Sequence, residues 1–104
     1  MTLADFGRMI ATIDPQARRY VNIGRGAYTV WREYGRIGAW TGGENEGGWR
    51  VQVDRYTREE NDAVAAAIAS ALEKNDEIAF DHTVDSELED GGVLIRHIFD
   101  CEVW

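Results

Sequence analysis

The sequence predicts a single α+β domain spanning residues 1–104, with helices packed on one face of an antiparallel sheet. Two periodicities of the apolar residues, one helical and one typical of strands, predict this fold class. Apolar residues recur every three or four positions near the start and in the alanine-rich middle, whereas they alternate elsewhere. With 104 residues, of which 44% are hydrophobic, the chain can fill one core. The predicted order of elements is α-β-β-α-β-β.

The first predicted element is a helix that begins after Thr2 and ends near residue 13. Thr2 and Asp5 have the spacing of a helix-capping pair. Pro15 disfavours helical geometry at the residue before it, so the helix should stop there, and residues 16–26 form a connector. The apolar face of this helix consists of Leu3, Phe6, Ile10 and Ile13.

Two strands are predicted next, over residues 27–34 and 49–56. The first is rich in β-branched and aromatic residues, and the second alternates, with Trp49, Val51 and Val53 on one face. Residues 35–48 between them hold six of the eleven glycines and predict a long loop. Such loops are usually functional or disordered. The large aromatic ring of Trp40 within it should either contact another subunit or pack locally over the sheet.

The second half of the chain predicts a helix and two further strands. Thr57 and Glu60 have capping-box spacing, and the helix should run to about Lys74 with Val64, Ile68, Ala71 and Leu72 as its apolar stripe. A weaker strand over residues 78–84 leads into an acidic turn over residues 85–92. The last strand, residues 93–104, places one set of residues on its apolar face: Ile95, His97, Phe99, Cys101 and Val103.

Composition limits the classes of function. The formal charge of −8 opposes binding to the phosphates of nucleic acid, so no specific nucleic-acid partner is expected. A single cysteine excludes an intramolecular disulfide framework. No apolar run approaches the roughly 18 residues of a membrane span, and the first residues lack the basic start of an export signal. We therefore expect a protein that is neither exported nor membrane-bound.

No catalytic or metal site is predicted. The candidate nucleophiles and bases are His82, His97, Cys101, Ser70 and Ser86. His97 and Cys101 are the best pair, yet four residues of strand separate them by about 13 Å, and both should be core residues. The acidic residues 81–90 do not have calcium-loop spacing. The expectation is a protein that is not an enzyme and needs no cofactor.

Surfaces are a more promising place for function. Most basic residues precede residue 59, and most acidic residues follow it. Such an asymmetry can help identical subunits meet in a ring, and it is also common on surfaces that only face solvent. The glycine-rich loop and the charged positions beside it form the candidate assembly surface, which consists of Arg36, Trp40, Glu44, Glu46, Arg50 and Asp54.

Three segments carry a resemblance to a known family. They are residues 28–34, residues 50–56 leading into the alanine-rich helix, and residues 96–104. Together they resemble the tail-completion or tail-terminator proteins of long-tailed bacteriophages and prophages over most of the chain. The ending departs from the family pattern, because Phe99 precedes Asp100 and Cys101 stands where an aromatic residue is common.

The resemblance implies a structural role without catalysis. It implies a homo-oligomer, a ring of six subunits when assembled, which still allows a monomer in solution. The implied partners are the tail tube protein and the head-connector proteins. The implied location is the virion tail, with assembly in the host cytoplasm.

Two other readings remain open on sequence alone. An acidic inhibitor or nucleic-acid mimic would suit the size and charge, although eight arginines between residues 18 and 58 interrupt the acidic surface. A small enzyme or ligand-binding domain would need a pocket with converging polar groups, and no cluster in the sequence indicates one.

Overall fold

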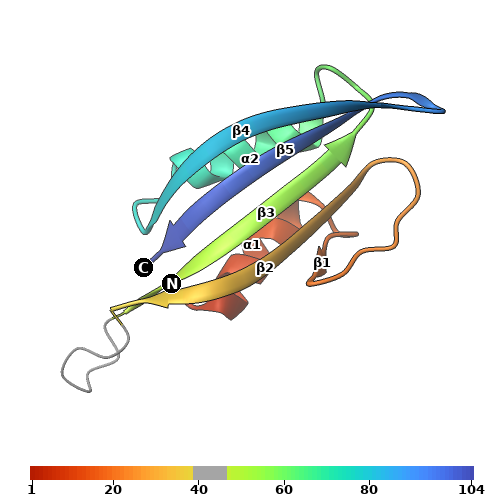
Figure 1. Cartoon of the computed structure of the whole chain (residues 1–104). Coiled ribbons are helices and arrows are strands. Elements are labelled where there is room, and N and C mark those ends of the chain that lie inside the picture. The colour runs from red at the N-terminus through yellow and green to blue at the C-terminus, as the bar shows by residue number, and fades with distance from the viewer. Residues whose placement is uncertain (39–46) are drawn as a thin grey trace.

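A computed structural model describes residues 1–38 and 47–104, and it has the predicted α+β architecture (Figure 1). Both helices lie on one face of a five-stranded sheet with strand order β1-β2-β3-β5-β4. The sheet is mixed and not wholly antiparallel, because the short β1 runs parallel to β2. In chain order the elements are α1 (Leu3–Ile13), β1 (Arg18–Arg19), β2 (Tyr28–Ile37), β3 (Gly48–Thr57), α2 (Ala63–Glu73), β4 (Ile78–Glu89) and β5 (Gly92–Val103).

The hydrophobic core lies between the helices and β2, β3 and β5. The predicted apolar faces of the first helix and the last strand are confirmed, since Phe6 and Phe99 are fully buried. The ring of Phe6 meets Trp31 edge-on at 5.4 Å. A side chain at Gly7 would come within 2.9 Å of Trp31, so glycine lets α1 approach the sheet closely. The buried core also includes Ile10, Val51, Val53, Ile68, Leu72, Cys101 and Val103.

The predicted acidic turn over residues 85–92 is wrong. β4 continues to Glu89 and pairs with β5 up to Gly92, which leaves only residues 90 and 91 in the turn. The acids at alternate positions of β4 lie on the face away from the helices, where a strand at the edge of a sheet tolerates charge. Gly92 has a φ of +106°, a conformation that favours glycine. The predicted loop over residues 35–48 is also shorter, because β2 runs to Ile37.

The second helix begins later than predicted. Its N-cap is Asp62, whose carboxylate accepts a hydrogen bond from the amide of Ala65 at 2.9 Å. Thr57 remains in β3, and its hydroxyl accepts from the amide of Glu59 and donates to Asp62. Both residues are good N-caps. Asp62 takes this place because its carboxylate also meets a buried arginine.

Arg55 joins four elements in the interior of the protein. Its guanidinium donates from Nε to Asp62 Oδ2 at 2.9 Å, and from Nη1 to Thr29 of β2 and to Asp14 after α1. Burial alone would raise the pKa of Asp62, but hydrogen bonds from Arg55 and the Ala65 amide outweigh it, and the pKa is lowered. The cluster fixes both helices against β2 and β3.

Removing one partner of this cluster should cost much more stability than breaking an exposed pair. We expect Arg55→Ala to lower the free energy of unfolding by about 3–5 kcal/mol, because it leaves a buried carboxylate without its counter-charge. Asp62→Asn, which keeps a good N-cap, should also be strongly destabilising. The matched control is Arg50→Ala on the same strand, whose pair with Glu102 is exposed and should cost less than about 1 kcal/mol. Urea denaturation measures these differences, and equal losses for the two arginine variants would contradict the assignment.

Candidate interaction surfaces and a histidine pair

The face of the sheet away from the helices is lined by ion pairs between β3 and β5. Arg96 donates to Asp54 at 2.8 Å, and Arg50 donates to Glu102 at 3.3 Å. Asp54 is only 9% exposed although no helix covers it, because its neighbours' side chains lie over it. Between β3 and β5 this open face is therefore a polar surface on which these four charges are paired.

The candidate assembly residues lie in three places. Arg50 and Asp54 lie together on the open face of β3. Arg36 lies on the helix side, because a bulge between Glu33 and Gly35 reverses the alternation of β2, and its guanidinium stands 4.9 Å from the Trp49 ring centroid. The remaining three lie outside the described residues: Trp40, Glu44 and Glu46.

The two edges of the sheet carry opposite charge. One edge is formed by β4, and residues 75–91 around it contain seven acidic residues and no lysine or arginine. The other edge is formed by β1 and β2, and residues 16–38 contain five arginines and one acidic residue, Glu33. The charge asymmetry expected from the sequence thus becomes a separation in space.

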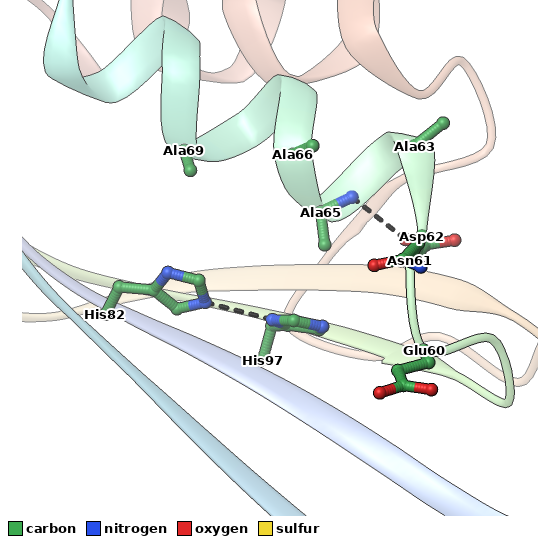
Figure 2. A pocket seen from close by; sticks show the side chains of 9 residues that line it. All are labelled: Glu60, Asn61, Asp62, Ala63, Ala65, Ala66, Ala69, His82 and His97. Carbon is green, nitrogen blue, oxygen red and sulfur yellow. Dashed lines mark hydrogen bonds between the residues drawn. The ribbon is translucent and has the colours of Figure 1, made fainter.

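A pocket between α2 and the sheet contains a pair of histidines (Figure 2). His82 of β4 and His97 of β5 approach with Nε2 and Nδ1 2.9 Å apart. The ring of His82 stacks on Phe99 at 4.3 Å. The alanines of α2 leave space above the two rings, and the start of that helix contributes polar groups. The lining also includes Glu60, Asn61, Asp62, Ala63, Ala65, Ala66 and Ala69.

The contact between the two histidine rings holds one proton. At 2.9 Å one ring nitrogen must donate and the other accept. Burial, and then the charge of His97, lower the pKa of His82. Nε2 of His97 is buried and has no hydrogen-bond partner in the part of the chain that the structure describes. The pair could take part in acid–base chemistry only if a substrate reached it, and neither of the candidate serines lines this pocket.

The sequence offers His82 as a candidate base, but it suggested Cys101 as the partner of His97, and the contact between the two histidines was not expected. The sequence signal for this contact is Gly91-Gly92, which marks the position of the turn. A tight turn at residues 90 and 91 places Val84 opposite His97, and His82 is then the diagonal neighbour on the same face. Cys101 lies in the core, as expected, and burial followed by the charge of Asp100 raises its pKa to about 12.

Two further tests concern metals and membranes. Among residues 1–38 and 47–104, no three side chains of His, Cys, Asp or Glu are placed to share a metal ion. Neither helix of the described chain is long and apolar enough to cross a membrane.

The chain matches no protein-family model and no curated protein. Its surfaces and the histidine pocket are therefore the observations from which a function is argued.

Cys101 should be inert in the folded protein. Because the thiolate is the reactive form and burial disfavours it, we expect negligible reaction with a thiol reagent at pH 8 and full reaction in urea. A colorimetric thiol assay checks this. Rapid labelling of the native protein would show that Cys101 is accessible and would contradict its place in the core.

Acid should weaken the fold in part through His82. Its lowered pKa means that the unfolded chain binds more protons, so stability decreases as pH falls below the ordinary histidine pKa of 6.5. We expect His82→Gln, which cannot be protonated, to lose less stability between pH 7.5 and 5.5 than the unmodified protein in urea denaturation. The pocket that His82 lines also contains His97 of β5 and, before α2, Glu60 and Asp62.

The control for this measurement is Thr83→Ala, which alters the neighbouring residue of β4 and keeps both imidazoles. It should follow the unmodified protein. If His82→Gln loses as much stability as Thr83→Ala over the same interval, His82 makes no contribution to the pH dependence.

Proposed function

We propose that this protein is a structural part of the tail of a long-tailed bacteriophage or prophage. In this role it completes or caps the tail tube and joins it to the head, as a ring of identical subunits. The observation that carries the proposal is the opposite charge of the two sheet edges. A ring needs two different, complementary surfaces on each subunit, and oppositely charged edges of one sheet supply them.

Two further observations support this role. The described chain is a small α+β domain, the fold class that the resemblance implies. The net charge of −8 suits the wall of a channel through which DNA passes, because repulsion keeps the duplex from adhering. The partners in the proposal are further copies of the chain, the tail tube protein and the head-connector proteins, in the virion tail and, during assembly, the host cytoplasm.

The proposal predicts a defect in joining heads to tails. Deleting the gene from the phage or prophage that encodes it should leave DNA-filled heads and separate tails, which negative-stain electron microscopy would count. Adding the purified protein to such a lysate should restore joined particles. Normal particles from the deletion strain would overturn the proposal and favour an inhibitor or another binding protein that acts away from the virion.

A further inference from the structure

We infer that the end of the β4–β5 hairpin of one copy docks on the connector between β1 and β2 of the next copy. The hairpin end comprises residues 84–95, and the connector comprises residues 20–27. The inference rests on the proposed self-assembly and names the two surfaces that would carry it.

The hairpin end presents apolar side chains without cover. β3 pairs with β5 only as far as Ile95, so the hairpin continues beyond the rest of the sheet (Figure 1). Leu88 and Val93 are cross-strand partners and share the helix side with Val84. All three are exposed, Leu88 by 83%, because the helices do not reach them. Exposed apolar groups gathered in this way are typical of an interaction site.

The connector presents a second apolar group on a fixed backbone. Tyr20, Val21 and Ile23 are exposed, Ile23 by 92%. The side-chain amide of Asn22 donates to the carbonyl of Thr29 at 2.8 Å and holds the connector against β2. An open hollow beside it is lined by Gln16, Arg18, Val21, Asn22, Ile23 and Gly24. The hollow can receive the side chains of the hairpin end.

Charge is complementary at the same two places. Asp85 and Glu87 lie on the other face of the hairpin, and Arg18 and Arg25 flank the apolar residues of the connector. Neither Glu87 nor Arg25 forms an ion pair with another described residue. Each surface therefore offers apolar groups and a charge that the other can satisfy, which commits the contact to a second copy of this chain.

The geometry suits a cyclic arrangement. One row of paired residues crosses the sheet from Tyr28 through Tyr56 and Arg96 to Asp85. The connector, which precedes Tyr28, and the hairpin end, which follows Asp85, thus lie at the same end of the sheet on opposite edges (Figure 1). Rotation about an axis parallel to the strands brings one against the other in successive copies. Such a contact is heterologous and can close into a ring.

A charge exchange tests the contact. We expect Glu87→Arg and Arg25→Glu each to raise the dissociation constant for self-association at least about tenfold, and the double variant to restore it. Leu88→Asp should abolish association. The matched control is Glu73→Arg at the exposed end of α2, near the end of β4 opposite the hairpin turn. It makes the same charge change away from both docking surfaces and should leave association unaltered. Sedimentation velocity measures association, and circular dichroism verifies that each variant is folded.

Several outcomes would overturn the inference. It fails if the chain stays monomeric at about 1 mM protein in about 50 mM salt. It also fails if the single variants associate normally, or if the double variant is no better than either one. The joining of heads to tails is measured separately, so the edge contact can fail while the proposed function stands. If both assays fail, the whole assignment is wrong.

Discussion

The buried guanidinium of Arg55 is the constraint on which the arrangement of the other elements depends. A desolvated arginine must be surrounded by acceptors, and these come from the end of α1, from β2 and from the start of α2. Asp62 meets two needs at once, because it neutralises Arg55 and accepts from the first turn of α2. The apolar core lacks directional preference, whereas this cluster sets where each helix begins or ends over the sheet.

Both helices pack on one face of the sheet, and the remaining surfaces differ in their charge and polarity. On the open face, two ion pairs join β3 to β5. The edges are different. On β4, three acids form no ion pair with another described residue: Asp81, Asp85 and Glu87. On the other side, β1 and the connector after it carry three arginines and exposed apolar side chains. Between them, the alanines of α2 leave space over His82 and His97. The candidate functional surfaces of this protein therefore lie at the two edges of the sheet.

Local patterns predicted most of the fold. The alternation around Val51 and the spacing of Phe6 and Ile10 place those residues correctly, because burial on one face follows directly from periodicity. The start of α2 was not predictable in this way, since Thr57 and Asp62 are both good caps and the burial of Arg55 beside Asp62 decides between them. The two-residue β1 depends on pairing with β2 alone. The contact between His82 and His97 follows from the register of the β4–β5 hairpin. Because the predicted turn was too long, that register, and with it the contact, was not predicted.

The short parallel strand β1 has a consequence for how many copies can join. An unpaired strand at the edge of a sheet can add strands from other molecules without limit, the route to fibrils. β1 occupies the backbone of β2 beside Val30 and Trp31, and Tyr20, with a φ of +72°, ends it immediately. At the opposite edge, the acidic side chains of β4 repel the β4 edge of another copy. Both features work against the addition of strands from other copies, at the middle of β2 and along β4. Association through side chains, which can specify a finite number of copies, is favoured instead.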